Sequence, residues 1–205
     1  MANHLHIGDL PTGLELGTSV AIDTEAMGLE PSRDRLCLVQ LSSGDGNCHL
    51  VQMLPHNNYD APNLKSLLSD RDILKIFHFA RFDVAMIRKY LGVPCNPVYC
   101  TKIASKLART FTDKHGYKDL CRELLQIDIS KQQQSSDWGA PNLSKEQIDY
   151  AATDVLHLHA IKKILDEKLE REGRVDLAKA CFSFIPHRSD LDLAGWNNQD
   201  IFSHS

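Results

Sequence analysis

Two acidic side chains one residue apart are the first feature of this 205-residue chain with recognisable chemistry. Asp23 and Glu25 lie in the run Ser19–Glu25, which has the apolar and β-branched character of a strand. Side chains alternate along a strand, so both carboxylates point to the same face. Such a pair repels unless a cation lies between them, and Mg²⁺ and Mn²⁺ accept all-oxygen ligands. By chance alone, about one such pair is expected in a chain of this acidic content.

A third carboxylate, Asp83, stands where a buried strand passes into an amphipathic helix, within Phe77–Ile87. This position places it at the rim of a sheet, where ligand crevices form. An acidic residue is also ordinary in the first turn of a helix, because the helix macrodipole favours it. The position of Asp83 is therefore compatible with a site role and with a purely structural one.

The fourth carboxylate, Asp154, follows Tyr150 by four residues on a long predicted helix. This spacing brings the phenol and the carboxylate to the same face, about one turn apart. Ala152 and Val155 share the buried side of that helix, so Asp154 stands at the margin of the core and needs a partner. A metal ion is one candidate, and an arginine or the backbone is the other.

The hydrophobic pattern predicts the elements that would position these side chains. Three β-rich runs, 19–25, 35–41 and 48–54, predict sequential antiparallel strands. After residue 62 the pattern predicts an α/β layer on this sheet, with strands at 73–77 and 97–100 and helices at 63–68, 81–91, 101–109 (capped by Thr101) and 116–125. We expect residues 128–142 to form a long polar loop, of the kind that is either functional or disordered.

The last third of the chain is predicted to be helical. A capping box at Ser144–Gln147 opens a helix that we expect to reach about Glu172, and a further helix should break at Pro186. The whole chain is expected to form one domain, 1–205, with 174–205 as a segment that docks on the body or on a neighbouring subunit, because its apolar tail needs cover.

Composition narrows the class of protein. The chain is 42% hydrophobic and 24% charged, without a run long enough to span a membrane or a secretory signal, and its six cysteines occur singly. We expect a soluble, cytoplasmic protein with reduced thiols. Residues 62–122 carry twelve Lys or Arg against five Asp, a net charge near +7. This excess, with the helical stripe Lys102, Lys106 and Arg109, indicates either a face that attracts a polyanion or ordinary solvated helices.

Taken together, the motifs resemble a known family. Asp23-x-Glu25, Asp83 at a strand–helix junction and Tyr150-x-x-x-Asp154 are similar to the three exonuclease motifs of the tyrosine-bearing DEDD superfamily. The resemblance implies an α/β fold of the ribonuclease H-like, DnaQ-like exonuclease type, a mixed sheet flanked by helices. The run Asp23–Leu29, His78-Phe-Ala, the helix start Gly116–Leu120 and Ser130–Trp138, which includes Lys131, are similar to ribonuclease D.

The short chain most resembles the nano-RNase C group within that family. The resemblance implies a 3′-to-5′ exoribonuclease that hydrolyses short oligoribonucleotides, down to dinucleotides, and assembles as a homo-oligomer, a ring-shaped octamer in the group's short members. Two alternatives stay open. One is a broader exonuclease acting on longer RNA, tRNA 3′ ends or single-stranded DNA, and the other is a catalytically silent nucleic-acid-binding module.

The resemblance also implies roles for individual residues. Asp23, Glu25, Asp83 and Asp154 would hold two divalent metal ions, Mg²⁺ or Mn²⁺, which is the chemistry that in-line phosphodiester hydrolysis requires. Tyr150 would orient the attacking water. Two residues would contact the substrate, Leu29 as an apolar wedge against bases and His78. Their structural alternatives are a core or turn leucine and a satisfied core histidine.

Overall fold

A single mixed sheet forms the centre of the computed structural model, which describes residues 2–130 and 132–204. Its strands within these residues are β1 (Asn3–Ile7), β2 (Ser19–Ala26), β3 (Leu36–Ser42), β4 (Cys48–Gln52), β5 (Leu74–Phe77) and β6 (Val98–Cys100). The strand order is β1-β4-β3-β2-β5-β6. Strands β2, β3 and β4 pair antiparallel, which confirms the prediction, whereas β5 and β6 join parallel. Strand β1, which the sequence pattern did not indicate, pairs parallel with β4 at the edge.

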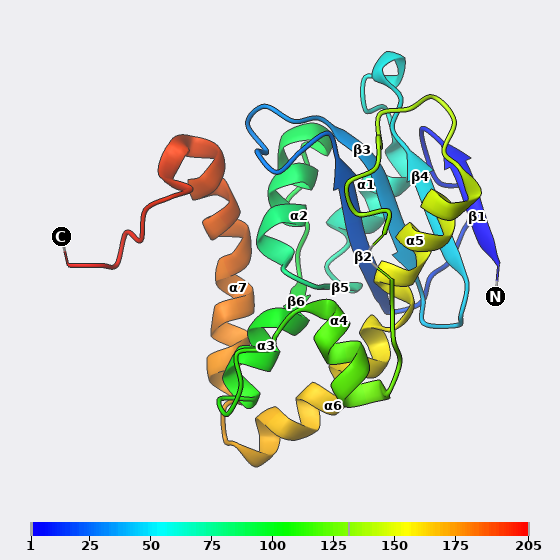
Figure 1. The fold of residues 1–205 in the computed structure, drawn as a ribbon. Helices are drawn as coiled ribbons and strands as arrows, with labels where there is room; N and C mark the ends of the chain where they lie inside the picture. Colours follow the sequence, from blue (N-terminus) through cyan, green and yellow to red (C-terminus); the bar gives the residue numbers. More distant parts are fainter. Residues whose placement is uncertain (1, 131, 205) are drawn as a thin grey trace.

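Helices cover this sheet on both faces (Figure 1). They are α1 (Pro62–Ser69), α2 (Ala80–Met86), α3 (Thr101–Ala108), α4 (Tyr117–Leu120), α5 (Lys145–Leu156), α6 (Leu158–Arg171) and α7 (Val175–Leu191). Short helical turns are η1 (Pro55–Asn57), η2 (Ile87–Leu91), η3 (Cys121–Leu125) and η4 (Asp192–Trp196). Turn η2 continues α2 and η3 continues α4, so these predicted helices are present with a changed pitch in their second half.

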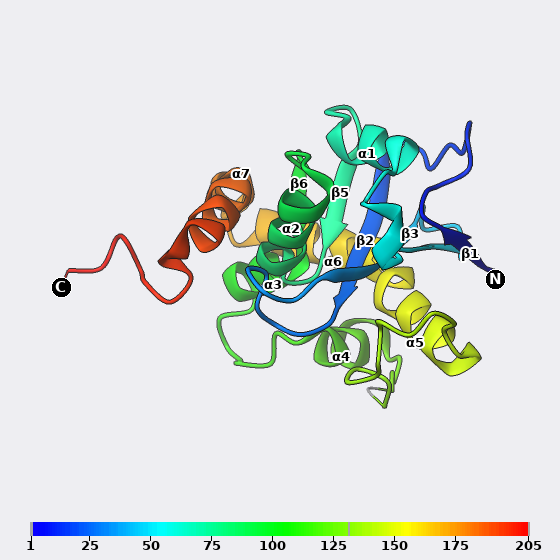
Figure 2. The ribbon, with the colours of Figure 1, turned by 90° about the horizontal axis from the view of Figure 1, so that it is seen from above.

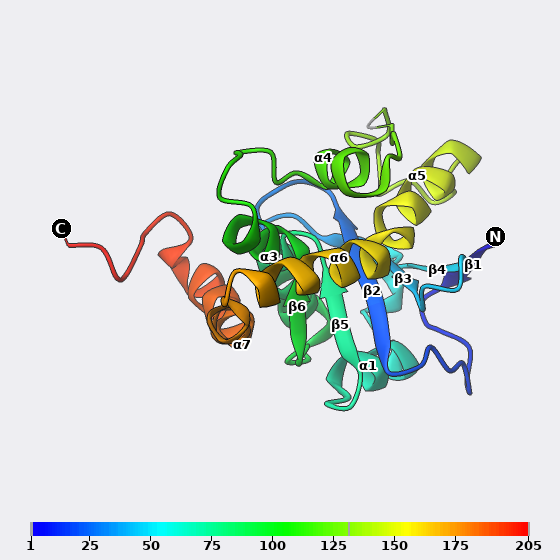
Figure 3. The ribbon, with the colours of Figure 1, turned by 90° about the horizontal axis from the view of Figure 1, so that it is seen from below.

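The views agree on how the helices are arranged. Helices α5 and α1 lie on opposite faces of the sheet (Figures 1 and 2), and α6 crosses beneath β2 and β5 (Figure 3). Helix α7 stands at the β6 end and packs against α2 and α3. The expected α/β architecture of a mixed sheet flanked by helices is therefore confirmed. Strand β3 is buried along its whole length because it lies inside this layered core.

Two predictions about the helices were wrong. The helix expected from Ser144 to Glu172 is interrupted at His157 (φ −104°, ψ −2°), which separates α5 from α6. Pro186 does not break α7. A proline inside a helix removes its own hydrogen bond to the carbonyl four residues earlier, and its ring crowds that carbonyl, at a cost of about 3 kcal/mol that packing can offset. Phe182, Ile185 and Ser189 are buried on both sides of Pro186, so packing holds the helix through this position.

Thr101 does not cap α3 as expected, because it is the first residue inside the helix. Its hydroxyl instead donates to the carbonyl oxygen of Phe77 at 3.1 Å. This bond ties the start of α3 to the end of β5. The junction between β5 and α2, where Asp83 lies, is thereby supported from the neighbouring strand–helix unit.

Part of the basic excess between residues 62 and 122 is buried and paired. Lys75 is fully buried, and its ammonium donates to the carbonyl oxygens of Asp70 and Asn96. The six cysteines are unpaired, and five of them are buried. Among the described residues, the structure holds no helix with the length and apolar character that a membrane crossing requires.

Candidate active site

Strand β2 presents the first two carboxylates as the alternation of its side chains requires. Asp23 and Glu25 are half-buried on one face, whereas Thr24 between them is buried on the other. Strand β2 is paired on both sides, by β3 and β5, so its backbone is fixed. The register with β3 shifts between Glu25 and Ala26, and such irregularities bend a strand and re-aim side chains.

Asp154 reaches the same place from helix α5. Oxygen atoms of Asp23, Glu25 and Asp154 all lie within 4.8 Å of one another. The start of α5 is fixed by the predicted capping box, in which Ser144 and Gln147 bond reciprocally. Further along the helix, the hydroxyl of Tyr117 donates to the carbonyl oxygen of Thr153 at 2.7 Å. Carboxylates that are distant in the sequence, on β2 and on α5, thus form one acidic cluster.

Asp83 adjoins this cluster but stands apart from its three members. It lies in the first turn of α2, is 3% exposed, and accepts a hydrogen bond of 2.7 Å from the hydroxyl of Thr24. Phe79, just before α2, adopts the left-handed conformation (φ 66°) and turns the chain sharply from β5 into the helix. The charge of Asp83 reaches the cluster, because it is the largest cause after burial that raises the pKa of Asp23.

The electrostatics of the cluster are those of carboxyl groups forced together. Burial, and then the neighbouring carboxylates, raise the pKa of Asp23 well above its usual value and that of Glu25 to about 9. Burial raises the pKa of Asp83 to about 7, against the opposing effect of the Thr24 hydrogen bond. Without a cation these groups retain protons. An all-oxygen set of this charge fits Mg²⁺ or Mn²⁺.

Tyr150 lies beside the acidic cluster on α5. Burial, followed by Asp154 and Glu25, raises the pKa of its phenol above the usual value, so the phenol keeps its proton. Its ring lies 6.1 Å from that of Trp138, which is buried.

Trp138 belongs to the polar segment 128–142, of which Lys131 lies outside the described residues. Gln147 donates to the carbonyl oxygen of Asp137 at 3.1 Å, Arg35 to that of Gly139 at 3.2 Å, and Gln52 to that of Ala140 at 2.9 Å. The segment is therefore bonded to α5 and the sheet beside the site, which suits the functional alternative expected there.

The two predicted substrate contacts differ in their surroundings. Leu29 is 88% exposed, which excludes a core role. The imidazole of His78 is half-buried, with Nδ1 2.9 Å from the hydroxyl oxygen of Thr101 and its ring 5.6 Å from that of Tyr117. Because the Thr101 hydroxyl donates to Phe77, it accepts from Nδ1, which fixes the proton of a neutral ring on that nitrogen.

The proposed basic stripe does not exist as one surface. Arg109 is 2% exposed and donates to Glu123, Ser105 and the carbonyl oxygen of Lys114. The spacing was right for one helical face, but Arg109 follows the last residue of α3, has a non-helical backbone (φ −122°, ψ 60°) and carries a buried side chain. Lys102 places its ammonium 4.4 Å from the centre of the exposed Phe79 ring.

Two residues of the site region were not singled out from the sequence. Thr24 is visible only as the spacer between two carboxylates, yet it holds Asp83. Phe79 belongs to the motif His78-Phe-Ala, but only the structure shows that its ring is 46% exposed at the start of α2, the helix that carries Asp83. From the sequence alone, Thr24 cannot be distinguished from an ordinary strand residue, nor Phe79 from an ordinary core residue.

Comparisons with known proteins agree with this geometry. Residues 9–170 match the 3′-5′ exonuclease domain family. A ribonuclease D of Gluconacetobacter diazotrophicus is 38% identical over 157 residues, which are 77% of this chain and 39% of that protein. The structure of Escherichia coli RNase D, described as an exoribonuclease involved in structured RNA processing, covers 84% of this chain and 45% of its own, with 25% identity and a TM-score of 0.73. This chain spans about two fifths of the length of the curated relatives it matches.

Other similar structures match along the whole chain. Brucella melitensis NrnC with bound Mg²⁺ is 53% identical, covers 100% of both chains and has a TM-score of 0.95. The same protein bound to pGG is 54% identical, covers 98% of both chains and also has a TM-score of 0.95. The fold is therefore that of ribonuclease D-like nucleases, and helix α7 and turn η4 follow the family match, which ends at residue 170.

Proposed function

The chain belongs to the 3′-5′ exonuclease family and is related to ribonuclease D, and we propose that it is an exoribonuclease of short RNA. It would release nucleoside 5′-monophosphates from the 3′ end of oligoribonucleotides, down to dinucleotides. The observation that carries this proposal is the convergence of Asp23, Glu25 and Asp154 beside Asp83. The similarity to a Brucella protein solved with Mg²⁺ and with pGG supports the choice of metal and of short substrate.

The four carboxylates fit a pair of divalent cations. We propose that Asp23, Glu25 and Asp154 hold one ion, that Asp23 also reaches the second, and that Asp83 holds the second directly or through water. When bound, such ions lower the pKa of the attacking water and stabilise charge on the departing oxygen. When all four carboxyl groups are ionised, their four negative charges balance the charge of two divalent cations.

Tyr150 is proposed to orient the attacking water. Its phenol keeps its proton, because burial and the adjacent carboxylates raise its pKa. It therefore acts as a hydrogen-bond donor and not as a general base. The ring of buried Trp138, 6.1 Å from that of Tyr150, packs beside the tyrosine and supports its position.

Leu29 and His78 are proposed to contact the substrate. Leu29 is 88% exposed on the loop that follows β2, the strand of Asp23 and Glu25, and such an apolar side chain suits contact with the face of a base, whatever the base. Contact with the face of a base does not involve the 2′-hydroxyl, so single-stranded DNA is proposed as a second substrate.

We propose, further, that the protein is a homo-oligomer, an octameric ring by family resemblance. Its support is the uncovered apolar end of the chain, where Ile201 is 46% and Phe202 76% exposed beside a cavity of about 420 Å³. Helix α7, the first part of segment 174–205, already packs on the body. A cytoplasmic location is proposed from the unpaired cysteines. Light scattering on the purified protein measures the subunit number.

The test of the function is hydrolysis of pGG with Mg²⁺ by the wild type and by Asp83→Asn. We expect the variant to lose activity by about a hundredfold or more, the scale on which single electrostatic groups act in catalysis. Asp113→Asn, at an exposed acidic position, is the matched control. Undiminished turnover in the Asp83 variant would contradict the proposal. Rates on RNA of about twenty nucleotides and on DNA of equal length separate the short-RNA enzyme from a broader exonuclease.

A further inference from the structure

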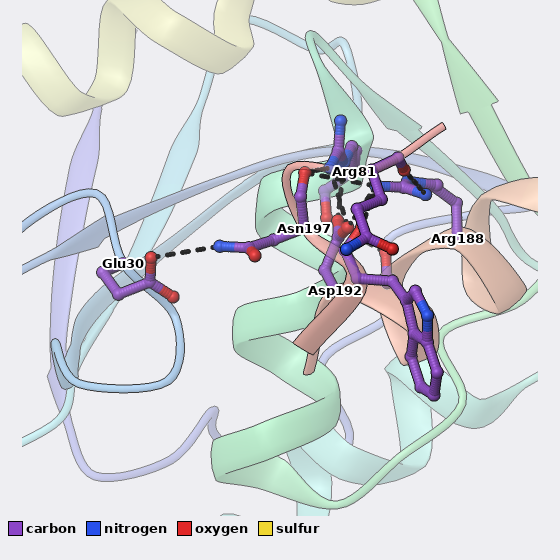
Figure 4. Close-up of polar contacts among 8 residues, drawn as sticks. Glu30, Arg81, Arg188, Asp192 and Asn197 are labelled. Atoms are coloured by element: carbon purple, nitrogen blue, oxygen red, sulfur yellow. Dashed lines mark hydrogen bonds and ion pairs between the residues drawn. The ribbon is translucent and has the colours of Figure 1, made fainter. Parts of the chain in front are cut away.

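The turn at the end of α7, residues Asp192–Asn197, lies against the active-site region and has no role in the function proposed so far. We call it the C-terminal turn. It follows the region matched to the exonuclease family, which ends at residue 170. Figure 4 shows it between the start of α2 and the loop after β2, and Figure 1 shows that loop reaching from the sheet toward α7.

An ion-pair network attaches the C-terminal turn to α2. Arg81 donates to both carboxylate oxygens of Asp192, at 2.5 and 2.7 Å, and to the carbonyl oxygen of Asn197 at 2.7 Å. The side chain of Asp192 is only 9% exposed and also receives Arg188 at 2.9 Å. Ser189 donates to the carbonyl oxygen of Arg81 at 3.0 Å. Two guanidinium groups bind the one carboxylate of Asp192 and fix this turn to α2. The contact on α2 is at Arg81, close in sequence to Asp83.

The C-terminal turn is also bonded to the loop that carries Leu29. The side-chain amide of Asn197 donates to the carboxylate of Glu30 at 3.3 Å (Figure 4). Glu30 directly follows Leu29, so this contact acts on the position of the exposed leucine. The loop is also held by its own residues, through the bond from the Asp34 amide to the Glu30 carbonyl oxygen, and by turn η2, where Tyr90 donates to the carbonyl oxygen of Asp34 at 2.9 Å.

A cavity of about 150 Å³ lies where these parts meet. Its lining includes Leu29, Phe79, Phe82, Arg81, Asp192 and Asn197. This volume is well below the 300–1,000 Å³ typical of sites for larger ligands. Leu29 and Phe79 present exposed apolar side chains to this cavity, and Asp192 and Asn197 of the C-terminal turn supply polar atoms. Apolar sides with polar groups at one edge suit a single nucleobase, which has an apolar face and a polar rim.

We propose that the C-terminal turn forms the outer wall of a subsite for one nucleobase and thereby selects short substrates. Asn197 acts as a positioning residue, because it holds Glu30 and through it Leu29. The C-terminal turn, which Arg81 binds to α2, closes the subsite on its outer side. Nucleotides beyond this base therefore find no further contacts in the subsite. This inference rests on the proposed function, since it names what determines the substrate length of the same site.

The test compares Asn197→Ala and Asp192→Asn with the wild type on pGG and on RNA of about twenty nucleotides. Loss of a hydrogen bond to a charged group corresponds to about tenfold in affinity. We therefore expect KM for pGG to rise by about tenfold at nearly constant kcat, while the longer RNA changes little, so that the preference for the dinucleotide falls. Asn197→Gln keeps the amide donor and should retain the preference. Asn198→Ala, at the exposed neighbouring position, is the matched control.

Equilibrium binding of both RNAs, and thermal unfolding of each variant, separate the possible failures. If the wild type binds pGG no better than long RNA, the inference is overturned whatever the activity. If the wild type prefers pGG and folded Asn197→Ala and Asp192→Asn keep that preference, the inference is wrong while the proposed function stands. If the wild type binds pGG tightly but does not hydrolyse it, the proposed function fails, and a weaker pGG affinity in the variants would still support the wall.

Discussion

Replacing Glu25 by glutamine should stabilise the metal-free protein, although it removes a residue of the acidic cluster. Burial and the charges of Asp154 and Asp83 raise the pKa of Glu25 from 4.5 to about 9 in the folded state. The folded protein therefore binds this proton more tightly than the unfolded chain. The stabilising contribution is complete below pH 4.5 and is lost as the pH rises toward 9.

The magnitude follows from the width of that interval. At pH near 7.5, about three units above the unfolded pKa, each unit corresponds to about 1.4 kcal/mol, so the lost stability is at most about 4 kcal/mol. Glutamine keeps the shape and cannot ionise. For a chain of this size, a gain of 2–3 kcal/mol raises Tm by on the order of 5–10 °C.

The assay is thermal and urea unfolding of EDTA-treated wild type and Glu25→Gln between about pH 5 and 9. We expect the unfolding free energy of the wild type to fall with pH and that of the variant to fall less. Glu170→Gln, an exposed position on α6, is the control and should follow the wild type. Adding Mn²⁺ should reverse the order, because an ion at a hundredfold its Kd adds about 2.7 kcal/mol to the protein that retains its ligands. Equal pH slopes for wild type and Glu25→Gln would refute the reasoning.

Three further predictions follow from single contacts. Thr24→Val removes the 2.7 Å hydrogen bond to buried Asp83, so it should cost about 1–3 kcal/mol in urea unfolding, and an unchanged midpoint would contradict the importance of that bond. Tyr150→Phe should lower kcat on pGG by about tenfold or more while the rise in Tm with Mn²⁺ persists, and loss of that rise would mean that the tyrosine serves the metal site. Arg109→Met should lower stability by about 1–3 kcal/mol, because Ser105 and the carbonyl oxygen of Lys114 lose a donor while Glu123 keeps Arg122 at 3.8 Å. It should not alter the salt dependence of RNA binding, and a changed salt dependence would return Arg109 to the RNA-binding face.

The acidic cluster could be predicted from the sequence because its information is local. Alternation on a strand places Asp23 and Glu25 on one face, and the capping box fixes the start of the helix that carries Asp154. Their convergence then requires only the order of the elements. The position of Asp83 is less determined, since the sequence does not show that Thr24, on the opposite face of β2, is its partner.

Charged residues show where sequence reasoning fails and why. Arg81 and Arg109 both belong to the basic third of the chain, and pattern alone treats them alike. The structure buries Arg109 against Glu123 and binds Arg81 to Asp192, 111 residues away. The free energy of a charged side chain depends on the partner that receives it, and that partner is set by tertiary contacts. The carboxylates themselves can therefore be predicted from the sequence, whereas the residues that hold them and shape the site around them, such as Thr24 and Arg81, are identified only from the fold.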